Sequence, residues 1–172
     1  MTIFLCGFMG CGKSTVGARL AKTLDCPFVD MDAYIEEQAG MTIPEIFAQY
    51  GEPHFRDLET QAIRELAERD GIIACGGGAM LREENAQIAA AHGVVMYLDV
   101  PFHVCYYRIA DSDRPIVRRS TREELEALYN TREPIYRRHS THTADASRTP
   151  AAAAAAVLEV LGLSQNDTGE QE

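Results

Sequence analysis

The sequence GFMGCGKST at residues 7–15 follows a short apolar run at residues 3–6 and leads into the periodic segment VGARLAKTL. The apolar run predicts a strand, and the periodic segment predicts a helix. Closely spaced glycines let the intervening backbone curl until its N–H groups converge at the start of that helix, where phosphate groups bind. The pattern G-x-x-x-x-G-K-[ST] between a strand and a helix therefore predicts a loop that holds nucleotide phosphates.

The parts of this loop have separate expected roles. Gly10 and Gly12 allow the backbone to turn, and Lys13 is expected to reach the β- and γ-phosphates of ATP. The hydroxyl of Ser14 is expected to ligate Mg²⁺. Such a loop alone is compatible with a kinase, a GTPase switch or an ATP-driven motor, so the rest of the sequence must decide among them.

Short apolar runs alternate with helical segments along the chain. The runs predict strands at residues 3–6, 27–29, 72–75 and 94–98. This alternation predicts an α/β fold, in which helices cover both faces of a parallel sheet. Capping signals predict helix starts at Thr42 with Glu45, Thr121 with Glu124, and Thr149 with Pro150.

Other segments depart from this alternation. Residues 110–120 carry Asp and Arg but little apolar material, so we expect a mobile loop between two helices. The alanine-rich run at residues 151–156 leads into apolar residues and is expected to form a packed terminal helix. The polar tail at residues 164–172 is expected to be disordered. A chain of 172 residues is expected to form about one domain.

Charge and cysteine content narrow the class of protein. A formal net charge of −10 opposes binding to nucleic acid or to an anionic membrane surface, because both repel an acidic protein. The five cysteines are scattered without a CxxC pair, so we expect buried, reduced thiols in a cytoplasmic protein rather than a metal or redox site. No signal-peptide pattern is present at the start of the sequence, and no export is expected.

Two carboxylates and three glycines follow predicted strands. Asp30 and Asp32 are two residues apart at the end of the second strand, so both are expected to face one cleft at the carboxyl edge of the sheet. Asp32 has an alternative role as the cap of the next helix, whereas Asp30 is harder to explain as a cap. The run Gly76, Gly77 and Gly78 ends the third strand, and its exposed N–H groups can hold an anion. Because that strand ends in glycine, Asp30 becomes the expected partner of Mg²⁺.

Arginines stand out at three positions. Arg132 lies in the apolar stripe of a predicted helix, so it needs an anionic partner, which is either a protein carboxylate or a ligand. Glu59 follows Arg56 by three residues and can orient its side chain. From spacing alone, a surface ion pair is the favoured explanation for Arg56 at this position. Arg114, in the expected mobile loop, is placed to close over a γ-phosphate and to stabilise charge in a transition state.

The segments GFMGCGKSTVG, FVDMD, FRDLE, CGGGAM, RPIV and REPIYRR, in this order and spacing, resemble those of shikimate kinases. The resemblance extends from the first strand to about residue 161. It implies a three-layer α/β/α fold with a five-stranded parallel sheet, related to the nucleoside monophosphate kinases, in a single domain over residues 1–163. It also implies a substrate-binding region near 32–62 and a mobile lid near 110–120. The implied reaction moves the γ-phosphate of ATP to the 3-hydroxyl of shikimate, on the route to chorismate and aromatic amino acids.

Carried onto this sequence residue by residue, the resemblance implies roles for the residues above. Those expected to bind ATP are Gly10, Cys11, Gly12, Lys13, Ser14, Thr15, Arg114 and Arg148, with Arg148 beside the adenine and Arg108 as a looser match for its other face. Those expected to bind shikimate are Asp32, Arg56, Gly77 and Arg132. Ser14 and Asp30 are the expected Mg²⁺ ligands, the latter through water. The expected catalytic residues are Lys13, Asp32 and Arg114, with Asp32 accepting the proton of the attacking hydroxyl.

Alternative functions stay open at this point. A gluconate kinase or a nucleoside monophosphate kinase would carry the same phosphate loop, but neither is expected to combine FRDLE and GGGAM with an inward Arg132. A regulatory module that binds ATP without transferring phosphate is opposed by Asp32 and the arginine pair. Cys11 has two possible roles. The favoured one is a small side chain without chemical function, and the alternative is a thiol whose modification inhibits the protein. A monomer is expected from the resemblance alone.

Overall fold

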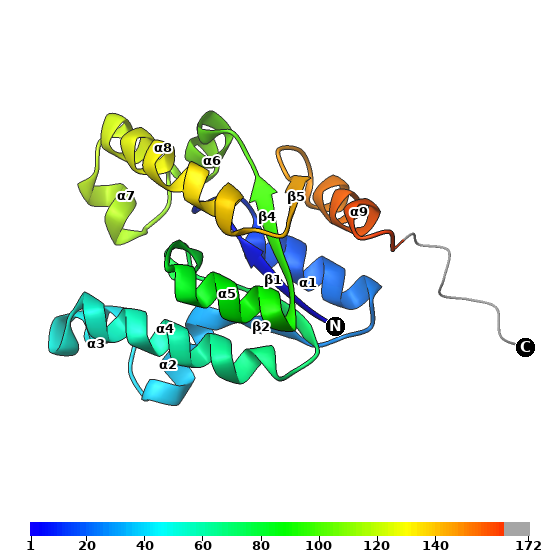
Figure 1. The fold of residues 1–172 in the computed structure, drawn as a ribbon. Coiled ribbons are helices and arrows are strands. Elements are labelled where there is room, and N and C mark those ends of the chain that lie inside the picture. Colours follow the sequence, from blue (N-terminus) through cyan, green and yellow to red (C-terminus); the bar gives the residue numbers. More distant parts are fainter. Residues whose placement is uncertain (164–172) are drawn as a thin grey trace, which may run out of the picture.

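β1 (Thr2–Cys6) is the central strand, and all its residues are buried. The strands lie in the order β2-β3-β1-β4-β5, and all neighbouring strands are parallel. The other strands are β2 (Phe28–Asp30), β3 (Gly71–Ala74), β4 (Gly93–Asp99) and β5 (His142–Asp145). The computed structural model describes residues 1–163 (Figure 1). The prediction of an α/β fold with a five-stranded parallel sheet is confirmed.

The strands that carry apolar runs lie close to their predicted bounds, but β5 has no such run. Only Ala144 of its residues is buried. β5 pairs with β4 alone and so forms an edge of the sheet, where one side of the strand needs no apolar cover. The resemblance to shikimate kinases implied a fifth strand, and no pattern in its own residues marked it.

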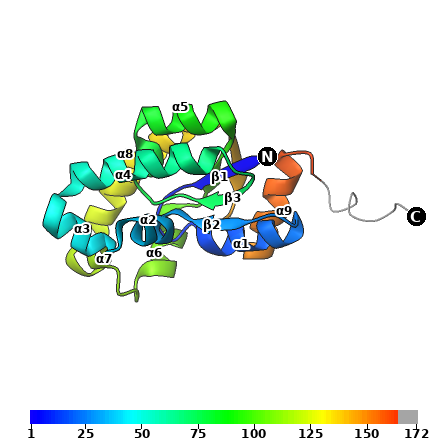
Figure 2. The same ribbon diagram turned by 90° about the horizontal axis from the view of Figure 1, so that it is seen from below.

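Helices cover both faces of the sheet. α1 (Lys13–Thr23) and α9 (Pro150–Val160) pack together on one face, and α9 also contacts β5. α5 (Glu83–His92) and α8 (Arg122–His139) pack against β4 on the other face, where α4 (Glu52–Ala67) lies beside α5. Figure 2 shows the two groups of helices on opposite sides of the strands. The core fills the space between sheet and helices, and it agrees with the predicted three layers.

Shorter segments gather towards the carboxyl ends of the strands. They are α2 (Met31–Ala39), α3 (Ile43–Tyr50), the 3-10 turn η1 (Ala79–Leu81), α6 (Phe102–Ile109) and α7 (Pro115–Arg119). Figure 1 shows α3 and α7 together at the end of the molecule opposite the N-terminus. Both predicted capping boxes are present, at the starts of α3 and α8, and the hydroxyl of Thr149 caps α9 as expected.

The expectation of a wholly irregular loop at residues 110–120 is wrong in one respect, because this segment contains α7. Pro115 occupies the start of that helix, where its fixed φ suits helical geometry and its missing N–H costs nothing. Within residues 1–163, no helix has the combined length and apolar character needed to cross a membrane. The tail predicted to be disordered, residues 164–172, lies outside the described residues.

Candidate active site

The loop between β1 and α1 curls as its glycines predict. Gly10 and Gly12 adopt φ angles of 82° and 97°, which residues with a side chain rarely adopt. A Cβ at Gly10 would also lie 2.8 Å from the carbonyl oxygen of Cys105, so there is no room for one. α1 begins directly after Gly12, and the free N–H groups of its first turn therefore open beside the loop.

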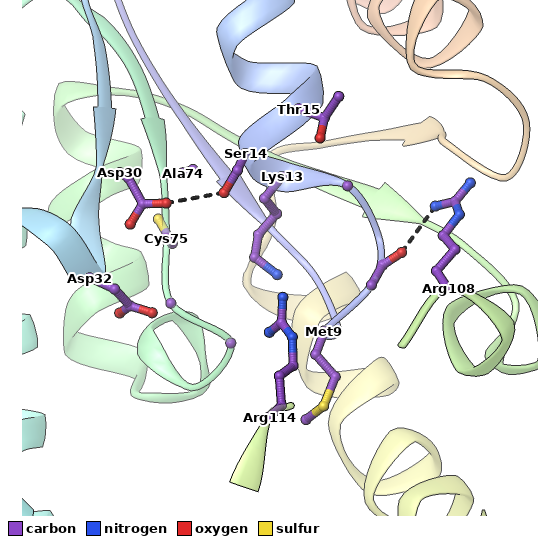
Figure 3. Close-up of a pocket in the computed structure, with 14 residues that line it drawn as sticks. Met9, Lys13, Ser14, Thr15, Asp30, Asp32, Ala74, Cys75, Arg108 and Arg114 are labelled. Atoms are coloured by element: carbon purple, nitrogen blue, oxygen red, sulfur yellow. Dashed lines mark hydrogen bonds between the residues drawn. The ribbon is translucent and has the colours of Figure 1, made fainter. Parts of the chain in front are cut away.

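Lys13, Ser14 and Asp30 lie together at the mouth of this loop. The Lys13 ammonium donates to the carbonyls of Gly7 at 2.7 Å and Phe8 at 3.3 Å. The Ser14 hydroxyl donates to Oδ2 of Asp30 at 3.1 Å (Figure 3). Among the described residues no three His, Cys, Asp or Glu side chains cluster as a metal site. A hydroxyl and one carboxylate suit Mg²⁺, which binds few protein oxygens and completes its shell with water and phosphates.

The structure corrects the expected arrangement of Asp30 and Asp32. β2 ends at Asp30 and α2 begins at Met31, so the two aspartates do not share an extended segment. Asp30 is the helix cap, since its Oδ1 accepts from the N–H of Ala33 at 3.1 Å, and the capping role considered for Asp32 is wrong. The side chain of Met31 is fully buried in the core. α2 begins at this residue, whereas the sequence pattern indicated that the extended segment continued to Asp32. Asp32 still faces the same cavity as Asp30, from the first helical turn.

Cavities open in series along this edge of the sheet. The loop cavity, of about 370 Å³, is lined by the phosphate loop with Asp30, Asp32 and Arg114. The arginine cavity, of about 520 Å³, is lined by Arg56, Glu59, Arg132 and apolar residues of α3 and α7. The side cavity, of about 180 Å³, is lined by Cys11, Thr15, Arg108, Arg148 and Pro150 among others. The loop and arginine cavities share a wall made of Met9, Asp32, Gly76, Gly77 and Arg114.

Asp32 is the carboxylate in this shared wall. Its Oδ1 is buried and has no hydrogen-bond partner among the described residues. Burial raises the pKa of Asp32, and the negative charge of Asp30 raises it further, while Lys13 and Arg114 act in the opposite direction. A raised pKa together with an unused acceptor oxygen suits a group that accepts a hydrogen bond or a proton from a ligand hydroxyl.

Arg56 forms ion pairs with one exposed and one buried carboxylate. Its Nη1 lies 2.6 Å from Oε1 of Glu59, whose side chain is only 1% exposed. Burial raises the pKa of Glu59, and the charge of Arg56 opposes that shift. Oε2 of Glu59 has no partner in the described part of the chain. Glu59 therefore holds the guanidinium at the arginine cavity, and the exposed Glu52 adds a surface ion pair to the same guanidinium at 3.1 Å.

Gly78 leaves room for that guanidinium. Its φ of −99° suits any residue, but a Cβ would lie 2.2 Å from Nη1 of Arg56. We expect Gly78→Ala to displace Arg56, because the atoms that must move are the end of a flexible side chain. The melting temperature should fall, since Glu59 is then left buried without its ion-pair partner. The KM for the molecule bound in the arginine cavity should rise about tenfold or more, as loss of a charged hydrogen bond predicts. An unchanged KM would mean that Arg56 does not bind that molecule.

Arg132 and Gly77 complete the arginine cavity. Arg132 extends from α8, is half-buried, and forms no ion pair with any of residues 1–163. Its Nη1 would lie 3.7 Å from a Cβ at Gly77. The inward arginine predicted from the apolar stripe thus points to a cavity rather than to a protein carboxylate. Two guanidinium groups at one cavity favour a ligand with a carboxylate or a phosphate.

Arg114 lies between the loop cavity and the arginine cavity. Figure 3 shows its guanidinium directed towards the ammonium of Lys13, with Asp32 and Met9 on either side. Converging positive charges repel each other unless an anionic group lies between them. Arg114 and Lys13 are therefore arranged to hold an anion at the junction of the two cavities.

Arg108 connects the loop to the side cavity. Its guanidinium donates to the carbonyl oxygens of Gly10 at 3.0 Å, Ala146 at 3.2 Å and Arg148 at 3.0 Å. The resemblance matched this residue only loosely, and two of its three partners come from the distant turn before α9. Arg148 lines the same side cavity as Arg108.

The cysteines near the site are free and mostly buried. Cys6, Cys11, Cys75 and Cys105 are buried as predicted, whereas Cys26 is partly exposed. Burial raises the pKa of Cys6 and of Cys105 to about 12, which keeps both thiols protonated. Cys11 is only 1% exposed, so a reagent must displace the loop to reach it.

Sequence reasoning missed the apolar wall of the arginine cavity. This wall contains Ile43, Pro44 and Phe47 of α3, Phe55 of α4 and Ile116 of α7. In the sequence, Ile43 and Phe47 read as the ordinary core face of an amphipathic helix. The exposed position of Phe47, at 37%, is what separates this face from a core face, and only the fold reveals it.

A phosphate-binding loop that opens into an anion-binding cavity defines a kinase of the P-loop class acting on a small acceptor. A family model described as shikimate kinase matches residues 9–162, and the chain therefore belongs to the shikimate kinase family. Members of this family use ATP with a divalent metal and phosphorylate a hydroxyl of shikimate.

Individual relatives agree with this assignment. The chain is 37% identical to shikimate kinase 2 of Dickeya chrysanthemi over 94% of this chain and 96% of that protein. It is 35% identical to the structure of shikimate kinase from Acinetobacter baumannii in complex with shikimate, with a TM-score of 0.85 over 97% of this chain and 95% of that one. A gluconokinase from Sinorhizobium meliloti is 18% identical over 94% of this chain and 91% of that one, with a TM-score of 0.62, which indicates a shared fold alone.

Proposed function

We propose that the protein transfers the γ-phosphate of ATP to the 3-hydroxyl of shikimate and releases shikimate 3-phosphate and ADP. The observation that carries this proposal is the wall shared by the loop cavity and the arginine cavity. A donor phosphate in the first cavity and an acceptor hydroxyl in the second would meet at Asp32 and Arg114. Phosphoryl transfer depends chiefly on such alignment and on neutralisation of charge.

Shikimate, the acceptor, lies in the arginine cavity. Arg56 and Arg132 bind the shikimate carboxylate, the backbone of Gly77 contacts the bound shikimate, and the apolar wall of α3 and α7 contacts the ring. Asp32 accepts a hydrogen bond from the attacking hydroxyl and takes its proton as the new P–O bond forms. Its unpartnered, buried Oδ1 supports this role.

The donor lies along the loop and side cavities. Gly10, Cys11, Gly12 and Thr15 hold the ATP phosphates through the loop, and Arg148 lies beside the adenine. Lys13 and Arg114 hold the γ-phosphate from two directions. The proximity of Ser14 to Asp30 supports a Mg²⁺ site, with Asp30 acting through water. When bound, Mg²⁺ neutralises charge on the β- and γ-phosphates.

Identification of the product tests the reaction. With ATP, Mg²⁺ and shikimate, phosphorus NMR should detect a new phosphate monoester, and its coupling to the ring proton at carbon 3 should assign the position. Release of inorganic phosphate without an ester would contradict the transfer. An ester at another hydroxyl would contradict the proposed acceptor position.

Arg132→Ala tests the carboxylate clamp. Because a hydrogen bond between charged groups contributes about 1.5–3 kcal/mol, the KM for shikimate should rise about ten- to a hundredfold, with little change in the KM for ATP. Arg122→Ala removes an exposed arginine from the same helix, near its start, and serves as the control. An unchanged KM for shikimate in Arg132→Ala would exclude the clamp.

Residues 32–62 bind the acceptor and residues 110–120 act as a lid, within one kinase domain that spans residues 1–163. The protein works as a monomer in the cytoplasm and binds neither nucleic acid nor membrane. A mass from light scattering, with and without substrates, tests the oligomeric state.

A further inference from the structure

Side chains from α5 and α8 hold the glycine run and the turn after it through backbone carbonyl groups. The Tyr136 hydroxyl donates to the carbonyl of Gly77 at 2.5 Å. The Asn85 amide donates to the carbonyl of Ala79 at 2.9 Å, and Nδ1 of His139 contacts that of Met80 at 2.7 Å. The three anchors come from α5 and α8, so the packing of these helices determines how the turn is oriented.

The N–H groups of the same run, unlike the carbonyl groups, are free to bind a ligand. Those of Gly76, Gly77 and Gly78 have no hydrogen-bond partner within residues 1–163, and all three glycines line the arginine cavity. In a trans peptide, the carbonyl of one residue and the N–H of the next point to opposite sides. The bond from Tyr136 to the Gly77 carbonyl therefore turns the Gly78 N–H away from the phenol.

Nothing within a run of three glycines selects this orientation. Glycine accepts both signs of φ at low cost, so the peptide between Gly77 and Gly78 can rotate and exchange its N–H for its carbonyl. A carbonyl oxygen facing the cavity would repel the carboxylate that Arg56 and Arg132 attract. Some group outside the run must hold the favourable orientation.

We infer that Tyr136 is a positioning residue for acceptor binding, whose hydroxyl keeps the Gly77–Gly78 peptide oriented with its N–H available to the acceptor carboxylate. This inference rests on the proposed function, since it assigns a cause to the anion preference of the arginine cavity. Tyr136 itself acts through Gly77 and Gly78.

The surroundings of Tyr136 suit this role. Its side chain is 1% exposed and stacks on Tyr97, with ring centroids 5.7 Å apart and planes at 21°. Burial raises the pKa of Tyr136, while the charge of Arg132 beside the phenol acts in the opposite direction without cancelling the rise, so the phenol keeps the proton that it donates. Arg132 precedes it by one helical turn, so a single helix positions both the cation and the anchor.

Tyr136→Phe tests the inference, because it removes the hydroxyl and keeps the ring that stacks on Tyr97. The matched control is Tyr129→Phe on the same helix, which removes a hydroxyl that donates to the carbonyl of Val100 at 2.7 Å. Both variants lose one hydrogen bond to a backbone carbonyl, but only Tyr136 contacts the glycine run. Measurements are kcat, the KM for shikimate and for ATP, the melting temperature, and calorimetric binding of shikimate and of its methyl ester.

We expect Tyr136→Phe to raise the KM for shikimate about five- to tenfold, as loss of one hydrogen bond predicts, with the KM for ATP unchanged. Binding of the uncharged methyl ester should weaken less than binding of shikimate, and Tyr129→Phe should leave both KM values unchanged. An unchanged KM for shikimate in Tyr136→Phe would overturn the inference. So would an equal weakening of ester and acid, or a rise in both KM values that Tyr129→Phe reproduces. Failure of the proposed function would appear separately, as a wild-type protein that does not phosphorylate shikimate.

Discussion

Asp32→Asn is expected to lower kcat by about a hundredfold or more, in the range of general-base contributions, while the KM for ATP changes little. The amide keeps the size of the carboxylate but cannot take the proton of the attacking hydroxyl. Asp57→Asn, which neutralises a carboxylate 74% exposed on α4, should leave kcat unchanged. Turnover close to that of the wild type in Asp32→Asn would remove Asp32 from catalysis.

The pH dependence of the same variant gives a second readout. Because burial raises the pKa of Asp32, the wild-type kcat/KM should fall with decreasing pH at higher values than an ordinary aspartate would require. Asp32→Asn should lose this acidic limb from its residual activity. An identical profile in the two proteins would assign the limb to another group.

Stability should move in the opposite direction from activity. A carboxyl group whose folded-state pKa is raised favours folding when protonated, and it opposes folding once the pH exceeds the folded pKa. Above that pH Asp32 therefore costs stability, and Asp32→Asn should melt there at the same temperature as the wild type or at a higher one. A clearly lower melting temperature would mean that the charge of Asp32 stabilises the fold.

Arg114→Ala is expected to reduce kcat by about a thousandfold, comparable with the loss of an arginine that stabilises charge on a transferring phosphate. Its guanidinium lies at the junction of the loop and arginine cavities, directed towards Lys13 (Figure 3). An effect on kcat with little change in the KM for shikimate is the pattern expected of an interaction made in the transition state.

Arg118→Ala is the matched control for this experiment. Arg118 lies on α7 close to Arg114, but its side chain is 68% exposed and pairs with Asp113. It lines neither the loop cavity nor the arginine cavity. Equal losses in the two variants would indicate a general effect of charge on α7 rather than contact with the phosphate.

The fold was predictable wherever a buried element has a continuous run of apolar residues. The strands at residues 3–6 and 72–75 are buried in the sheet, so their apolar runs are continuous. β5 has a single buried residue, Ala144, so it has no apolar run from which a strand could be predicted. The short helix after Arg114 is set by Pro115, whose signal is weaker than that of the charged residues around it.

The candidate site was predictable to a different extent. The phosphate loop is local in sequence, so its geometry follows from its own residues. The environment of Asp32 is not local: its burial comes from α2 turning into the core at Met31, and the strand pattern placed it wrongly on an extended segment. The buried Glu59 beside Arg56 and the apolar wall of α3 likewise depend on contacts between distant elements, which spacing along the chain cannot supply.

The most direct test of the account is a coupled assay of ADP release with purified protein, ATP and Mg²⁺, in which shikimate, gluconate and nucleoside monophosphates are compared as acceptors. We expect rapid ADP release with shikimate and only background release with the other acceptors. Comparable release with gluconate or a nucleoside monophosphate, or no release with any acceptor, would contradict the proposal that this site phosphorylates shikimate.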